Sequence, residues 1–309
     1  MQAGDAAGGD KRGPQSAALL IHDDEEYRFR DPRVDGHAAP PVLVDAAARR
    51  DALVVVGGPL PALGAVLDAV AEHAPGVALP DVVSVKGPVL DAVRARGLGA
   101  RFVGGHPMAG TAHSGWGATD PELFRGATWL VAADDDADPD TWSRVARMAL
   151  DSGARGVAST SADHDAAVAR ISHLGHVLAE ALALAGGRGG DLALALAAGS
   201  FRDGTRVAGT APALVRAICE PNRDALVAAL DDCLADLGAA RDSLASTGTL
   251  GPLVDEGHRA RLAYEAARPA GGGDAPGGRA AVTVTPGAPG WLEALREAGS
   301  AGREVRPAG

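Results

Sequence analysis

The sequence predicts an α/β domain with a parallel sheet, followed by an all-α domain. From about residue 46 to 160, short β-branched apolar runs alternate with helix-patterned segments, which is typical of parallel strands joined by crossover helices. From about residue 161 to 268 the apolar residues recur only with helical spacing. A Gly/Pro-rich stretch then leads into a short tail. Four regions are therefore expected: 1–45, 46–160, 161–268 and 269–309.

The expected elements of the α/β part follow in order. Residues 1–17 have the composition of a disordered segment, 18–21 form a candidate strand, and 22–41 show no sustained period. The next elements are a helix end at 45–50, strands at 53–56, 82–85, 101–103, 128–132 and 156–158, and helices at 61–73, 88–96 and 138–152. Ligands bind at the carboxyl ends of strands in such a sheet. Gly57, Ser84 and His106 are therefore expected on one rim.

The helical part should contain several long elements and only a small tail. Helices are expected at 163–185, opened by the capping residue Asp163 and closed by Gly186 and Gly187, and at 191–199, 211–219 and 222–244. Their broad apolar faces predict mutual packing or a dimer interface. After a linker at 269–279, a strand at 281–285 and a helix at 291–298 are too little for an independent domain.

Composition excludes several classes of protein. The 309 residues are enough for two domains. A net charge of −11 and 3% aromatic residues argue against nucleic-acid binding, since basic and stacking surfaces are both lacking. No apolar run approaches the roughly 20 residues of a membrane span, and no secretion signal is recognised. Cys219 and Cys233 have neither metal-ligand nor disulfide-scaffold spacing, so a cytoplasmic location is expected.

The stretch RFVGGHPMAGTAHSG at residues 101–115 has the composition of an active-site loop. Gly104 and Gly105 allow the backbone to approach a ligand closely, and Pro107 biases His106 toward an extended conformation. The ordinary pKa of histidine lies nearest neutrality, so His106 is a candidate general base or proton shuttle. A buried, hydrogen-bonded histidine in a structural turn is the alternative.

Ser84 and Lys86 lie at the end of the strand expected at 82–85. In a functional interpretation, Ser84 hydrogen-bonds to His106 or to a substrate, and Lys86 lines a cofactor or substrate cleft. In the alternative interpretation, Ser84 caps the strand and Lys86 is a solvated surface residue. Position alone does not separate the two.

The helical part carries two further candidate pairs. His173 and His176 share a helix face, but no third ligand accompanies them at helical spacing, so no metal is expected. Arg206 follows Asp203 by three residues. An arginine is well shaped to bind a carboxylate, although a surface Arg/Asp pair explains the same spacing.

Four motifs in this order give the sequence a family resemblance. VVSVK at 82–86, GGHPMAGTAHSG at 104–115, ISHLGH at 171–176 and FRDGTR at 201–206 together resemble the prephenate dehydrogenase family of tyrosine biosynthesis. The resemblance covers roughly residues 51–244 and, more loosely, the tail to about 303. The family motif SHLPH has proline where this chain has Gly175, a change that bears more on the orientation of His176 than on that of His173.

The resemblance implies an NAD- or NADP-dependent oxidative decarboxylation of prephenate to 4-hydroxyphenylpyruvate. His106 would take the proton of the ring 4-hydroxyl as hydride leaves C4, and loss of the ring carboxylate as CO2 would aromatise the ring. Arg206 would bind that carboxylate with Asp203 as its orienting partner, while Ser84 and His173 position the substrate. His176, Thr111 and Lys86 are expected near substrate, and Gly57, Gly58, Pro59 and Ser84 near cofactor. Arogenate is the alternative substrate, and a homodimer through the helical domain is implied.

The dinucleotide fingerprint of that family is missing. Its members open with a strand, GxGxxG and a helix whose N-terminus faces the pyrophosphate, but no GxGxxG occurs in this chain. His22, Asp23 and Asp24, after the strand at 18–21, are a candidate substitute for the acidic residue that binds ribose. The expectation is an incomplete Rossmann-like domain with a divergent or truncated N-terminus. The competing hypothesis is a catalytically impaired dimeric remnant that binds aromatic acids.

Overall fold

The computed structural model describes residues 18–23, 26–30, 52–57, 60–110, 120–267 and 281–308. Several expectations fall outside these ranges: the disordered lead-in at 1–17, the helix end at 45–50, Asp24, Gly58, Pro59, Thr111 and the linker at 269–279.

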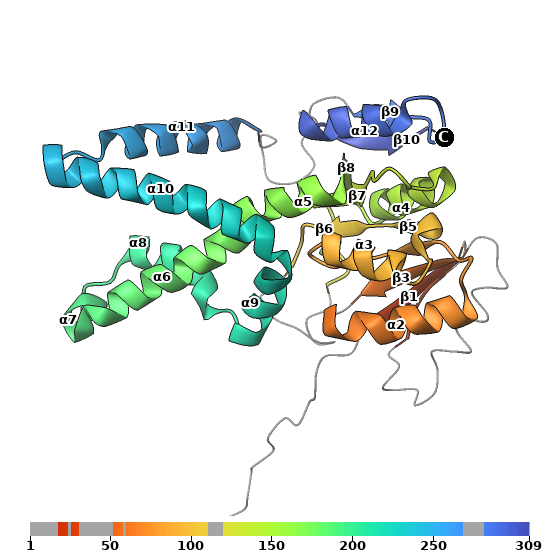
Figure 1. Cartoon of the computed structure of the whole chain (residues 1–309), viewed down its shortest axis with the longest axis horizontal. Helices are drawn as coiled ribbons and strands as arrows, with labels where there is room; N and C mark the ends of the chain where they lie inside the picture. The colour runs from red at the N-terminus through yellow and green to blue at the C-terminus, as the bar shows by residue number, and fades with distance from the viewer. Residues whose placement is uncertain are drawn as a thin grey trace, which may run out of the picture.

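The first half of the described chain forms small parallel and mixed sheets with helices packed on them (Figure 1). β3 (Leu53–Gly57) is bridged in parallel to the segment that contains β4 (Leu79–Pro80), and β4 pairs in parallel with β5 (Phe102–Val103). β6 (Gly105–Pro107) pairs antiparallel with β7 (Thr128–Ala132), whereas β7 and β8 (Arg155–Ser159) are parallel. The expected alternation of strands and helices and the expected parallel strand pairs are confirmed, and the antiparallel β6/β7 pair was not predicted.

The strand predicted at 82–85 is wrong, because these residues form the loop between β4 and α3 (Gly87–Arg94). Val83 and Val85 are nevertheless buried in the core around β3. The loop is held by hydrogen bonds from the Val82 amide to the Val56 carbonyl (3.0 Å) and from the Val83 amide to the Asp81 carboxylate (3.1 Å). A buried loop therefore produces the same apolar pattern as a buried strand.

The N-terminal strands are antiparallel. β1 (Ala18–Asp23) includes the predicted strand and extends it, so His22 and Asp23 lie inside a strand instead of after it. β2 (Glu26–Arg30) lies in the segment that was predicted to be irregular. β1 pairs antiparallel with both β2 and β3. A dinucleotide-binding βαβ unit needs parallel neighbours, so the β1/β3 pair does not provide that unit.

Two hydrophobic clusters stabilise this half. The first joins β3 to α2 (Leu60–His73) and α3. The second surrounds Trp142 on α4 (Pro139–Asp151), a helix that is capped by Asp138, whose carboxylate accepts from the Thr141 amide.

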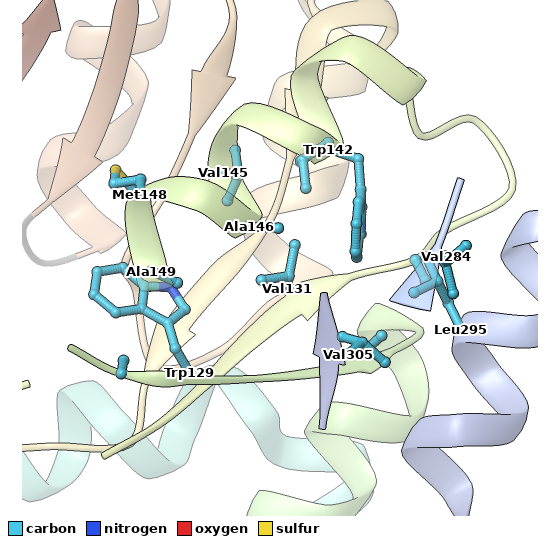
Figure 2. Packing of buried hydrophobic residues seen from close by; sticks show 14 of the residues in the cluster. Trp129, Val131, Trp142, Val145, Ala146, Met148, Ala149, Val284, Leu295 and Val305 are labelled. Atoms are coloured by element: carbon cyan, nitrogen blue, oxygen red, sulfur yellow. The ribbon is translucent and has the colours of Figure 1, made fainter. Parts of the chain in front are cut away.

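The C-terminal tail belongs to the second cluster. β9 (Val282–Val284), α12 (Trp291–Ser300) and β10 (Val305–Pro307) form a small unit in which β9 and β10 are parallel. Val284, Leu295 and Val305 pack toward Trp142 and Val131 (Figure 2). The predicted strand and helix are confirmed, whereas β10 was missed. The tail shares its core with the sheet and is not an independent domain.

The second half is helical and extends away from the sheets (Figure 1). Its elements are α5 (Ser161–Val168), a π-helical turn (Ala169–His173), α6 (Leu174–Arg188), α7 (Gly190–Ala195), α8 (Gly199–Thr205), a 3-10 turn (Arg206–Gly209), α9 (Pro212–Cys219), a 3-10 turn (Glu220–Asn222), α10 (Arg223–Thr247) and α11 (Gly251–Ala267). None of the helices in the described ranges is long and apolar enough to cross a membrane.

The predicted helix at 163–185 differs from the structure at both ends. Thr160 caps it by accepting a hydrogen bond from the Asp163 amide, so Asp163 lies inside the first turn. The helix also continues through Gly186 and Gly187 to Arg188. A π turn interrupts its middle, and such turns often occur at functional sites.

Candidate active site

His106 lies on β6, and the glycine before it is required by close packing. A Cβ at Gly105 would lie 2.7 Å from the Asp81 carbonyl oxygen and 3.1 Å from Trp129 Nε1. The first distance is too short for any side chain without a shift of the backbone, and the second is tight. The glycine therefore brings the His106 backbone against the loop after β4, which is a different role from the close approach to a ligand that the sequence suggested.

Lys86 and Asp81 hold the backbone of Gly105, the residue before His106, by hydrogen bonds. Lys86 is 1% exposed and Asp81 is 0% exposed. The Lys86 ammonium donates to the Asp81 carboxylate and to the Gly105 carbonyl oxygen (2.7 Å), and Asp81 accepts from the Gly105 amide (3.0 Å). Burial raises the pKa of Asp81 and lowers that of Lys86, while their mutual attraction opposes both changes. The Lys86 ammonium is therefore buried against the loop that carries His106 and does not line an open cleft. Asp81 was not among the residues predicted from the sequence.

A row of hydrogen bonds runs from His106 into the helical domain. His106 Nδ1 lies 2.9 Å from His164 Nε2, and His164 Nδ1 lies 2.8 Å from Asp165 Oδ1. The Asp165 carboxylate also accepts from the Lys86 amide (2.8 Å) and the Gly87 amide (2.7 Å), at the N-terminus of α3. Neither His164 nor Asp165 was among the site residues predicted from the sequence. Their adjacency in the first turns of a helix was the available signal.

Burial determines the protonation of His106. Loss of solvent, followed by the charges of His164 and Lys86, lowers the pKa of His106 to about 3, and Asp165 opposes this shift. The imidazole is therefore neutral at pH 7. Burial acts to raise the pKa of Asp165. Hydrogen bonds from His164, Gly87 and Lys86 outweigh this effect and lower the pKa, so the carboxylate is ionised.

His173 belongs to the same buried network. It lies on the π turn, is 1% exposed, and its Nδ1 lies 3.1 Å from Asn222 Nδ2. Asn222 Nδ2 also donates to the Asp165 carbonyl oxygen (2.8 Å). Burial lowers the pKa of His173. His176 is half-buried, and its enclosed Nδ1 has no hydrogen-bond partner among the described residues. In the described part of the chain, no group of three histidine, cysteine or acidic residues is arranged to hold a metal.

The remaining predicted residues make no hydrogen bond to His106, His164, Asp165 or His173 in the described part of the chain. Ser84 is half-buried and makes no hydrogen bond to His106. Arg206 and Asp203 are exposed on α8 and the turn after it, which pack on α6. Asp203 Oδ1 lies 3.7 Å from Arg202 Nε. Among the described residues, no ion pair joins Asp203 to Arg206. Gly57 ends β3.

The described residues fit the reactive end of a nicotinamide cofactor better than its pyrophosphate. Within the described ranges, neither the half-buried Ser84 hydroxyl nor His106 Nε2 has a hydrogen-bond partner, so both are available to a ligand. Gly57 ends a strand at the edge where a cofactor would pass. The antiparallel β1/β3 pair, in contrast, does not supply the crossover helix N-terminus that would bind phosphates.

Two models of one family match consecutive parts of the chain. The nucleotide-binding domain of prephenate dehydrogenase matches residues 36–158, and the dimerization domain of prephenate dehydrogenase matches residues 160–250. A family of unknown function, DUF1028, matches residues 1–42.

Individual proteins give the same result. The chain is 31% identical to the cyclohexadienyl dehydrogenase of Zymomonas mobilis over 72% of this chain and 78% of that protein. It is also 31% identical to the prephenate dehydrogenase of Bacillus subtilis, but over 46% of this chain and only 39% of that protein. Among solved structures, a suggested prephenate dehydrogenase of Corynebacterium glutamicum has a TM-score of 0.79 and 44% identity, covering 90% of this chain and 87% of that one.

Proposed function

Because this chain belongs to the prephenate dehydrogenase family, we propose that it catalyses the NAD(P)-dependent oxidative decarboxylation of prephenate to 4-hydroxyphenylpyruvate. The observation that supports this most directly is His106, a neutral imidazole whose Nδ1 is engaged and whose Nε2 is free among the described residues. Arogenate, which has an amino group where prephenate has a keto group, is the alternative substrate.

In this proposal His106 holds a proton during the reaction. Nε2 accepts the proton of the substrate 4-hydroxyl as hydride departs from C4, and the cofactor supplies the acceptor for that hydride. When the bond to the ring carboxylate breaks, its electron pair aromatises the ring and CO2 leaves. His106 then returns its proton to the phenolate oxygen, so the product carries the hydroxyl proton with which the substrate began.

Substrate binding is assigned to groups on the helical domain. Arg206 is proposed to bind the ring carboxylate, since its exposed guanidinium makes no ion pair with described residues and has the planar fork that carboxylates favour. Asn222 donates to His173 Nδ1, so His173 carries its proton on Nε2 and is available there as a donor. Ser84 and Gly57 are proposed to contact the cofactor.

We also propose that the dimerisation domain joins two copies of this chain. Large apolar side chains are exposed on its helices: Leu182, Leu184, Leu234, Leu237, Leu244, Leu253, Val254 and Leu262. A surface of this kind is typical of a protein interface. Sedimentation at micromolar concentration should give twice the mass of one chain, and a monomer would refute this assignment.

The rival hypothesis is an impaired remnant, and cofactor binding separates the two. The purified chain is titrated with NAD+ and with NADP+ in a calorimeter, with and without prephenate, and turnover is followed by formation of the reduced cofactor. Binding of either nucleotide together with turnover that His106→Asn abolishes supports the dehydrogenase. A folded protein that binds neither nucleotide would show that the family membership records ancestry and not activity.

A further inference from the structure

We propose that His164 and Asp165 are positioning residues that fix His106 as the tautomer protonated on Nδ1, leaving Nε2 as the base. The inference rests on the proposed function, in which His106 is that base. It adds two residues from the helical domain to a reaction that the sequence assigned mainly to the loop after β5.

The direction of each hydrogen bond follows from Asp165. An ionised carboxylate can only accept, and the oxygens of Asp165 face the Lys86 amide, the Gly87 amide and His164 Nδ1. His164 therefore carries its proton on Nδ1. In the neutral form of this ring, Nε2 has a lone pair and accepts the hydrogen bond at 2.9 Å, so the proposal assigns the proton between the two rings to His106 Nδ1.

The hydrogen bonds from His106 through His164 to Asp165 also partly offset the positive charge that His106 acquires during turnover. In the described ranges, the charged and titratable groups that act on His106 are His164, Lys86, Asp165 and His173, and of these four Asp165 alone favours the imidazolium. A proton accepted on Nε2 strengthens the Nδ1–H donation to His164, which is in turn held by the Asp165 carboxylate. Burial makes His106 a poorer proton acceptor, and this hydrogen-bonded carboxylate opposes part of that effect.

The arrangement also depends on how the two halves of the chain meet. His106 is on β6, whereas His164 and Asp165 are on α5. Asp165 is anchored in a third place, because its side chain binds the first amides of α3. A carboxylate held by two backbone amides has little freedom to rotate, so the orientation of His164, and through it that of His106, is set by the main chain.

The neighbouring His173 provides an internal contrast. The Asp165 carbonyl oxygen can only accept, so the Asn222 atom that faces it is the amide nitrogen. That nitrogen then donates to His173 Nδ1 as well, which puts the His173 proton on Nε2. The network therefore predicts Nδ1–H for His106 and His164 and Nε2–H for His173.

The test is the tautomer of each ring in the full chain, with neither substrate nor cofactor added. Long-range nitrogen–proton NMR spectra of protein with 15N-labelled histidine, recorded at about neutral pH, distinguish the two tautomers, and single substitutions assign the signals. We expect Nδ1–H at His106 in the wild type. In His164→Leu we expect His106 to shift to Nε2–H, because its Nδ1 loses the acceptor.

Two further variants sharpen the result. His164→Gln should retain Nδ1–H at His106, since the glutamine carbonyl can take the place of imidazole Nε2. His258→Leu, at an exposed position on α11, should leave the His106 signal unchanged. If the active enzyme is obtained, His164→Leu should lower kcat by about 100-fold with little change in KM, and His164→Gln should restore most of it.

Nε2–H at His106 in the wild type, or an Nδ1–H signal unaffected by His164→Leu, would overturn the proposal. If His164→Leu does not fold, the wild-type and His164→Gln spectra decide the question. Because the tautomers are measured without ligands, a chain that shows the expected tautomers but no turnover would refute the proposed function and leave the positioning role intact.

Discussion

The buried Lys86–Asp81 pair gives the most stringent test of how the catalytic loop is held. Lys86→Met keeps most of the side-chain volume but removes the ammonium that donates to Asp81 and to the Gly105 carbonyl. Both partners are almost fully buried, so the Asp81 carboxylate and the Gly105 carbonyl lose a donor that water cannot replace. Breaking a buried pair in this way costs about 3–5 kcal/mol.

Equilibrium unfolding in urea, followed by far-UV circular dichroism at pH 7, measures this loss. The matched control is Arg94→Met, because Arg94 pairs with Asp136 and the two side chains are 46% and 43% exposed. An exposed pair of this kind contributes about 0–1 kcal/mol. The large difference between the two variants is the prediction, and equal losses would refute the argument that Lys86 stabilises the loop from within the core.

The pH dependence of the Lys86→Met variant adds a second check. Burial raises the pKa of Asp81, and the variant loses the cation that opposes this. The native variant then retains a proton that the unfolded chain releases, so its stability should fall as pH rises above the ordinary carboxyl pKa of 3.8. Adding Asp81→Asn to Lys86→Met removes this titration and should make the decline disappear.

Three other predictions concern single positions. Gly105→Ala should cost about 1–3 kcal/mol of stability in thermal melts, because its Cβ would lie 2.7 Å from the Asp81 carbonyl oxygen. Gly175→Ala should cause no loss, since nothing lies within 4 Å of its Cβ and alanine favours the helix α6. Gly299→Ala would place a Cβ 1.6 Å from a carbonyl oxygen of β8, and limited proteolysis should therefore release the C-terminal tail faster than in the wild type. Since the pKa of His106 is about 3, protonation of His106 should not lower kcat/KM between about pH 5 and 8. The unfolded chain binds a proton at this histidine below the ordinary pKa of 6.5 and the folded chain does not, so stability should decline as the pH falls from 6.5 toward 3. An acidic limb near pH 6.5 that His106→Asn removes would contradict both expectations.

Local pattern predicted the elements whose burial follows a simple period. The strand at 128–132 and the helix at 138–152 agree with β7 and α4 within about a residue, because an apolar run and an Asp-Pro cap specify them locally. The strand at 82–85 failed because burial of valines does not require strand pairing. β2 was missed since its sequence, EYRFR, is mostly polar and is stabilised by its antiparallel partner.

The candidate site was predictable only in part for a related reason. His106 was recognised from the glycines and proline beside it, which act locally. His164 and Asp165 reach His106 only because the fold brings α5 against β6, although His106 and His164 are 58 residues apart in the sequence. Asp81 could not be predicted for the same reason, since its partners Lys86 and Gly105 come together only in the folded chain.

In the described part of the chain, the hydrogen-bond network around His106 contains no residue before Asp81. His106, His164, Asp165 and His173 make no hydrogen bond to an earlier described residue, whereas the antiparallel β1/β3 pair lies in the cofactor half of the domain. Binding of prephenate should therefore survive even if nucleotide binding is weak. Calorimetric titration with prephenate, without nucleotide, should show binding that Arg206→Met weakens at least about tenfold, through loss of a charge-assisted hydrogen bond to the ring carboxylate. Arg223→Met, which removes another exposed arginine of the helical domain, is the control. Equal affinities in the two variants would refute Arg206 as a ligand of the ring carboxylate, and no binding to the wild type would show that the substrate site is not formed without the cofactor.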